Sequence, residues 1–141
     1  MASAIYNIAK TNLANGIVNY INDDIRIALT YNYVYDVDNH ISFDNVSAYE
    51  VVGSGYTQGG ISLSNKTIVQ DNSSDRVYFR SDDCNWESTT ITANGAVVYK
   101  LGATNADSPL IAYIDFTTVF QTNNQNFIIK WNATEGVFHL R

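Results

Sequence analysis

The chain has 141 residues, of which 45% are hydrophobic and 16% are charged, and this size and balance predict one globular domain over residues 1–141. Its formal net charge of −6 disfavours sequence-independent binding of nucleic acid, which requires Lys and Arg to neutralise phosphates. The hydrophobic residues include 10 Tyr and only 1 Met, together with many Ile and Val, and this composition favours strands over helices.

The first residues and the cysteine content bear on location. The N-terminus lacks a basic region followed by an apolar run, and no segment approaches the roughly 20 apolar residues of a bilayer crossing, so the sequence predicts neither a targeting segment nor a membrane contact. Cys84 is the single cysteine and has no partner for an internal disulfide. This pattern is typical of synthesis in a reducing compartment.

The first predicted element is a short amphipathic helix over residues 3–15. Ser3 is a favourable N-cap, because its hydroxyl can accept a hydrogen bond from the first helical turn. Ile5, Ile8 and Leu13 fall on one helical face. Since this apolar stripe is narrow, we expect the three side chains to contact either a sheet edge or a neighbouring subunit.

Strands are predicted next, at Ile17–Ile21 and Asp24–Thr30, with a polar turn between them. Alternation of large and polar side chains continues through residues 31–38 and predicts a row of three tyrosines on one strand face. The row is either a binding platform or the cover of a sheet flank. Its members are Tyr31, Tyr33 and Tyr35.

A short helical turn over Asp44–Glu50 is predicted to lead into Glu50–Ile61, a segment dense in glycine. Because glycine adopts positive φ without steric cost, this density predicts a sharp and defined turn. We name the segment the glycine corner and expect it to be structural. Its defining residues are Gly53, Gly55, Tyr56, Gly59 and Gly60.

After the glycine corner, short strands are predicted at Ile61–Leu63 and Thr67–Gln70. The second is expected to form a hairpin with Asp75–Arg80, because a polar turn joins the two segments. The acidic stretch Asp82–Glu87 follows. It contains Trp86, whose side chain is either a core residue or an exposed anchor.

The C-terminal part has the strongest strand signals. A nearly unbroken apolar run predicts a central strand over Gly95–Leu101, and Pro109 stands at the start of the next strand, Leu110–Phe116. The segments Asn126–Asn132 and Gly136–Arg141 are expected to form the final pair of strands. These short strands together predict a mainly β fold, either an antiparallel β-sandwich or an open barrel, with one N-terminal helix.

No arrangement of residues typical of an enzyme or a cofactor site is found. The glycine corner departs from the dinucleotide-binding pattern, because Gln58 stands where the third glycine belongs. The segment Asp36–His40 begins like a calcium loop, but Ile41 occupies the position of the required glycine. Neither histidine is in a metal-binding spacing with Cys84. We therefore expect no catalytic residue, metal or cofactor.

Five segments carry a resemblance to a known family. They are the helix from Tyr6 to Gly16, the strand Ile25–Leu29, the corner Gly53–Gly60, the run Ser108–Phe116 and the ending Phe127–Asn132. Together they resemble a family of small virion proteins of tailed bacteriophages, over nearly the whole chain. The resemblance implies a place in the virion after synthesis in the cytoplasm of a bacterial host. The segment Tyr31–His40 departs from the family pattern, and partner-specific contacts are expected to differ there.

Within a virion, the acidic and β-rich character favours a capsid decoration, or cement, protein that binds the outer shell and stabilises it. The expected partners are the major capsid protein or other virion proteins, and the expected state is a homo-oligomer. Two alternatives stay open: a tail, neck or connector component, and a receptor- or carbohydrate-binding module in which aromatic side chains stack on sugar rings. The candidate contact residues are Ile5, Ile8, Leu13, Tyr31, Tyr33, Tyr35 and Trp86.

Overall fold

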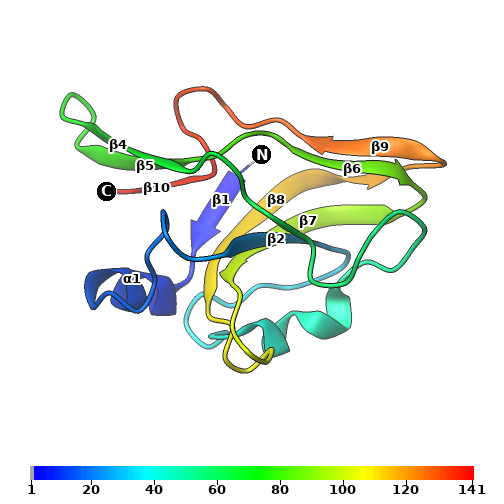
Figure 1. Cartoon of the computed structure of the whole chain (residues 1–141), viewed down its shortest axis with the longest axis horizontal. Helices are drawn as coiled ribbons and strands as arrows, with labels where there is room; N and C mark the ends of the chain where they lie inside the picture. The colour runs from blue at the N-terminus through cyan, green and yellow to red at the C-terminus, as the bar shows by residue number, and fades with distance from the viewer. Residues whose placement is uncertain (1) are drawn as a thin grey trace.

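The fold is mainly β, with antiparallel sheets and one short N-terminal helix, as the sequence predicts (Figure 1). The computed structural model describes residues 2–141, and within them no sheet closes into a barrel. Three sheets share one cluster of buried side chains, in a sandwich-like arrangement.

The largest sheet has five strands, in the order β1 (Ala2–Ile5), β8 (Leu110–Gln121), β7 (Thr92–Lys100), β2 (Ile25–Thr30) and β3 (Ile61–Ser62). Its central strand is β7, where residues 95–99 are all buried, and the apolar run in the sequence predicted this position. The strand β8 begins directly after Pro109, as predicted, but it continues well beyond Phe116.

Two smaller sheets complete the fold. One has the order β10 (Phe138–Leu140), β5 (Arg76–Arg80) and β4 (Thr67–Asp71), and the other pairs β6 (Cys84–Thr89) with β9 (Gln125–Ile129). The predicted hairpin is β4–β5. The expected final pair is wrong, because β9 pairs with β6 whereas β10 pairs with β5. The chain turns away between them, where the indole N–H of Trp131 donates to the carbonyl of Asp82 at 3.1 Å.

The N-terminal helix is shorter than predicted. Helix α1 spans Asn7–Ala14, its N-cap is Tyr6, and Ser3 and Ile5 belong to strand β1. Strand β1 pairs with β8, with Ala2 opposite Asp115. The sheet edge offers backbone hydrogen bonds to this segment, and tertiary pairing outweighs the weak helical pattern.

Two predicted strands are turns or loops instead. At Ile17–Ile21, the side chain of Asn19 accepts hydrogen bonds from the backbone N–H groups of Ile21 and Asn22, at 3.2 Å and 3.1 Å, and this closes a turn. Residues 31–38 form a loop because Asn32 adopts a φ of 58°, which breaks the strand alternation. The predicted helical turn before the glycine corner is present as two 3₁₀ helices, η1 (Phe43–Asn45) and η2 (Ser47–Tyr49).

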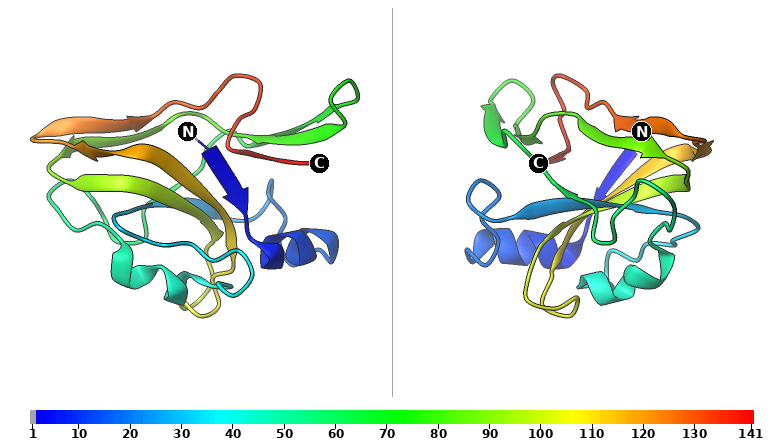
Figure 2. Two further views of the ribbon diagram at one scale, coloured as in Figure 1. Left: turned by 180° about the vertical axis from the view of Figure 1, so that it is seen from behind. Right: turned by 45° about the vertical axis from the view of Figure 1, so that its right-hand side comes forward.

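The molecule has two dissimilar ends (Figures 1 and 2). On the left of Figure 1, the β4–β5 hairpin projects from the body of the fold above α1, and the C-terminus lies beside it. On the right lie the ends of β6 to β9 and the loop of the glycine corner. Tyr20 joins the projecting sheet to the core, because its ring packs edge-on against Phe79 and Phe138 with centroids 5.2 Å and 5.7 Å away.

Candidate functional site

The glycine corner is built by close approach of backbone segments. A Cβ added to Gly60 would lie 1.8 Å from the carbonyl oxygen of Ile27, and one added to Gly55 would lie 2.6 Å from that of Ser88. Both distances are far below van der Waals contact, so only glycine fits at these two positions. The glycines of the corner with positive φ are Gly55 at 80°, Gly59 at 93° and Gly60 at 75°.

A buried polar network holds the corner against strand β2. The hydroxyl of Tyr56 donates to Oε2 of Glu50 at 2.5 Å and accepts from the backbone N–H of Leu29 at 3.0 Å. The backbone N–H of Gly59 donates to the same carboxyl oxygen at 2.7 Å. The hydroxyl of Tyr99 donates to the Gly59 carbonyl at 2.6 Å. The Tyr56 hydroxyl, Oε2 of Glu50 and both backbone polar groups of Gly59 thus have partners inside the protein.

Glu50 is the one acidic side chain in this network, and it is only 8% exposed. Burial raises the pKa of its carboxyl, while the hydrogen bonds from Tyr56 and Gly59 act in the opposite direction. Burial, followed by the neighbouring Glu50 charge, also raises the pKa of the Tyr56 hydroxyl. Both groups face each other and the backbone rather than solvent. The pair therefore has a structural role, because its polar atoms are not presented to a substrate.

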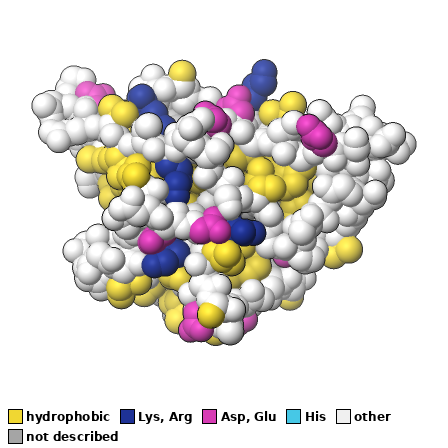
Figure 3. Space-filling model, viewed as in Figure 1, with side chains coloured by type: hydrophobic (Ala, Val, Ile, Leu, Met, Phe, Trp, Pro, Cys, Tyr) yellow, Lys and Arg dark blue, Asp and Glu magenta, His cyan; other side chains and the backbone are white. Residues whose placement is uncertain are grey.

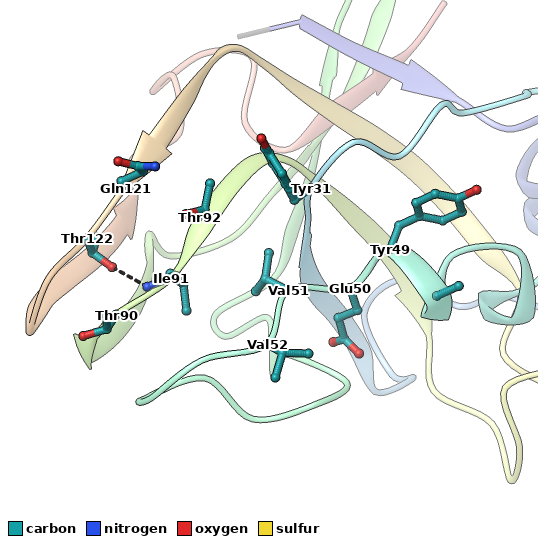
Figure 4. Close-up of a pocket in the computed structure, with 11 residues that line it drawn as sticks. Tyr31, Tyr49, Glu50, Val51, Val52, Thr90, Ile91, Thr92, Gln121 and Thr122 are labelled. Carbon is teal, nitrogen blue, oxygen red and sulfur yellow. Dashed lines mark hydrogen bonds between the residues drawn. The ribbon is translucent and has the colours of Figure 1, made fainter.

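A cavity of about 460 Å³ opens beside the corner (Figure 4). Figure 4 shows Tyr31, Gln121 and Val52 reaching the cavity from three different segments, whereas the carboxyl of Glu50 turns away from Tyr31. The lining offers hydroxyl and amide groups but no exposed acid, base or nucleophile. The lining residues are Tyr31, Ala48, Tyr49, Glu50, Val51, Val52, Thr90, Ile91, Thr92, Gln121 and Thr122.

The predicted row of tyrosines does not form. Tyr33 is 5% exposed, and its hydroxyl lies 2.9 Å from the hydroxyl of Tyr6 and 2.7 Å from Nδ1 of His40. Tyr31 and Tyr35 are 40% and 41% exposed and so differ from Tyr33 in burial, because the segment is a loop and not a strand. The ring of Tyr35 instead stacks on Tyr113, with a centroid distance of 4.6 Å.

The other candidate contact residues lie mostly inside the fold. Ile5, Ile8 and Leu13 are partly buried and pack against the core of their own chain. Trp86 is 3% exposed and packs between Tyr56 and Phe127, with ring centroids 6.2 Å and 6.1 Å away. Of the two alternatives for Trp86, the core position is the one observed.

Within residues 2–141, no group of three or more His, Cys, Asp or Glu side chains is arranged to hold a metal ion. Cys84 is buried, and burial raises the pKa of its thiol to about 12, so this cysteine is almost entirely in the unreactive thiol form near neutral pH. The described chain also contains no helix that is long and apolar enough to cross a membrane.

The sequence interpretation missed a set of exposed apolar side chains. Val52 is 84% exposed, and Val119, Phe120 and Ile128 are each close to half exposed, at 49%, 48% and 49%. The missed signal is in β8, since β-branched and aromatic residues continue past Phe116, where the predicted strand stops. Another missed residue, Ile68, lies on β4 and is 45% exposed.

No protein-family model matches the chain, and neither curated proteins nor solved structures include a match to it. No relative therefore supplies a functional residue. The function proposed for the chain therefore depends on its surface and on the resemblance of five of its segments to a known family.

Proposed function

We propose that the chain is a structural protein of a bacteriophage virion, and specifically a capsid decoration protein that binds the outer shell and stabilises it. The observation that carries this proposal is the projecting sheet β10–β5–β4, which stands away from the body of the fold with an open edge at β4 (Figures 1 and 2). The resemblance implies the virion, and the projecting sheet provides a surface for contact with a shell protein.

The open edge suits a protein contact. Strand β4 pairs with β5 on one side, and in the described sheets it has no neighbour on the other. The backbone N–H and C=O groups of such an edge can pair with a strand of another protein. Ile68 lies opposite Phe79, so the two side chains share one face, and Ile68 is the exposed member. An apolar side chain beside free backbone groups is the combination that strand addition uses.

Charged side chains surround this edge and can set the orientation of a partner. Asp71 lies opposite Arg76 at one end of the β4–β5 pair. Hydrogen bonds from Ser73 and Ser74 lower the pKa of Asp71 to about 2, so its carboxylate stays charged at neutral pH. Lys66 precedes the other end of β4, and its ammonium donates to the carbonyl of Asp23 in the same chain. The edge is therefore apolar at its middle and charged at its margins, as a protein contact requires.

The competing functions receive less support. Stacking of sugar rings needs exposed aromatic faces, and Trp86 and Tyr33, two of the four aromatic residues considered for it, are buried. A tail, neck or connector position uses the same kind of surface contact as a shell position. The location of the protein in the virion is therefore the observation that distinguishes these two functions.

The direct test is binding of the purified protein to mature shells and to isolated tails of the phage that encodes it. We expect co-sedimentation with shells and density over the whole shell by electron cryomicroscopy. Ile68→Asp is expected to weaken binding at least about tenfold, because a desolvated carboxylate would replace an apolar contact. Val34→Asp is the matched control, since Val34 is 82% exposed on a loop far from β4 in sequence. Binding to tails but not to shells contradicts the proposal.

A further inference from the structure

Charged residues are absent from four tracts of 12 or more residues. Three of them, Val51–Asn65, Ser88–Tyr99 and Phe116–Ile129, contribute to one surface, and Thr11–Asn22 lies elsewhere. The 8 basic and 14 acidic residues of the chain all lie outside them. The fold brings parts of the three tracts together on the right of Figure 1. We name this surface the uncharged end and define it by residues 52–58, 88–94 and 117–126. In Figure 3, most charged side chains lie over the left and centre of the face, one acidic side chain lies at the upper right, and the margin beyond it shows none.

Uncharged hydrogen bonds fix this end of the molecule. The backbone N–H of Thr90 donates to the carbonyl of Ser54 at 2.9 Å, which ties the corner to the start of β7. The backbone N–H of Thr122 donates to the carbonyl of Ile91 at 2.9 Å, and that of Asn124 donates to the Thr90 hydroxyl at 3.0 Å. The surface is therefore held in place without an ion pair, and a partner would meet a preformed shape.

Two hollows flank a ridge on this surface. The ridge is Gln121–Thr122 at the end of β8, and both residues line the cavity of Figure 4 and a second cavity of about 400 Å³. Lys130 also lines the second cavity and is the charged residue at the border of the uncharged end. Aromatic rings form much of the second cavity: Phe120 packs edge-on against Phe116 and Phe127, at 6.0 Å and 6.4 Å between centroids. A ridge beside two hollows can interlock with an identical surface, as a self-complementary contact requires.

We propose that the uncharged end is the surface through which one copy of the chain binds a second copy. The distribution of charge favours a second copy of the chain as the partner. Two copies each carry a net charge of −6, and this is the end at which they can meet without bringing their like charges together. A basic partner would instead be attracted to the acidic remainder of the surface. Depletion of charge together with exposed aromatic and aliphatic side chains is the composition of interface cores.

This self-association does not depend on a shell, so it goes beyond the proposed function and is tested apart from it. Sedimentation equilibrium of the purified chain is expected to show a concentration-dependent oligomer. Added salt should leave the association unchanged or strengthen it, since salt screens the repulsion between acidic copies and no interfacial ion pair is lost.

Phe120→Asp is expected to weaken self-association at least about tenfold, because it places a charge in the interface. Val52→Asp gives a second test on an 84% exposed loop residue, where loss of folding is not expected. Ile68→Asp is the matched control, since Ile68 at 45% and Phe120 at 48% are about equally exposed at opposite ends. A wild-type monomer at all concentrations overturns the inference, as does an oligomer that dissociates with Ile68→Asp but not with Val52→Asp.

Discussion

The two ends of the molecule are stabilised in different ways. Beside the uncharged end, the glycines of the corner bring backbones into contact around the buried Glu50–Tyr56 pair. At the hairpin end, which comprises α1, residues 15–24 and the sheet β10–β5–β4, charged groups hold the loops. The carboxylate of Asp23 there accepts from the backbone N–H of Asn19 at 2.7 Å and lies 3.1 Å from the ammonium of Lys100. The first end depends on shape and the second on charge, so substitutions and pH should affect them differently.

The largest difference between the ends is expected for the two tryptophans. Trp86→Ala should lower the free energy of unfolding by about 3–5 kcal/mol, because it leaves a cavity in the aromatic cluster behind the corner. Trp131→Ala, in the segment between β9 and β10 that leads into the hairpin end, should cost about 1–2 kcal/mol, since Trp131 is only partly buried. Urea denaturation measures both. Equal losses would break the comparison, because they would make the hairpin end as tightly packed as the corner.

Substituting two glycines distinguishes the cost of steric overlap from the cost of the backbone conformation. Gly60 and Gly16 have similar φ values of 75° and 80°, but an added Cβ meets the Ile27 carbonyl at Gly60 and nothing within 4 Å at Gly16. Gly60→Ala should therefore cost about 3 kcal/mol, and Gly16→Ala about 1 kcal/mol from the left-handed conformation alone. Thermal unfolding of the two variants gives the difference. Similar shifts would show that the corner moves freely away from β2.

Two buried tyrosines test the polar network. Tyr56→Phe removes the acceptor of the Leu29 N–H and the hydroxyl that donates to the Glu50 carboxyl. The free energy of unfolding should therefore fall by about 1–3 kcal/mol. Tyr20→Phe at the hairpin end removes a single bond, to the Arg80 carbonyl at 3.1 Å, and should cost about 1 kcal/mol. Denaturant midpoints at constant slope measure both changes. A smaller loss for Tyr56→Phe than for Tyr20→Phe would contradict a structural role of the network.

The smallest expected effects are changes of stability with pH, and they have opposite signs for Glu50 and Asp23. Burial raises the pKa of Glu50 above its ordinary 4.5, so its contribution to stability is full below that value and is lost as pH rises through the raised pKa. The hydrogen bond from the Asn19 backbone, with Lys100 nearby, lowers the pKa of Asp23 below its ordinary 3.8. Its contribution is present above that value and is lost as pH falls through the lowered pKa.

Urea midpoints between about pH 3 and pH 7 test these signs with two isosteric variants. Relative to wild type, Glu50→Gln should gain stability as pH rises through the raised pKa of Glu50, and Asp23→Asn should lose stability as pH rises through the lowered pKa of Asp23 towards 3.8. Parallel curves for the two variants would contradict the assignment of shape to one end and charge to the other.

Elements whose signal is local could be predicted from the sequence. The run Gly95–Leu101 is apolar throughout, and a strand buried on both faces is the structure that such a run forms, so β7 was correctly placed at the centre. Pro109 correctly predicted the start of β8, because proline lacks the N–H that a strand interior needs. The polar turn at residues 71–74 likewise predicted the β4–β5 hairpin.

Elements that depend on distant partners could not be predicted. Ser3 and Ile5 have a helical pattern, but the free edge of β8 more than a hundred residues away draws them into a strand. Tyr31 and Tyr33 alternate as in a strand, yet residues 31–38 have no strand to pair with, and the side chains separate in burial. The uncharged end was missed for the same reason, since its tracts are adjacent only after folding.

The pairing of β1 with β8 has a consequence for how the chain acquires its structure. Ala2 meets Asp115, so the edge of the largest sheet joins the first residues described to a strand in the last third of the chain. During synthesis, β1 has no partner until β8 has left the ribosome, so it is among the last strands described here to find its place. Contacts so distant in sequence slow folding, and we expect refolding in milliseconds to seconds rather than microseconds.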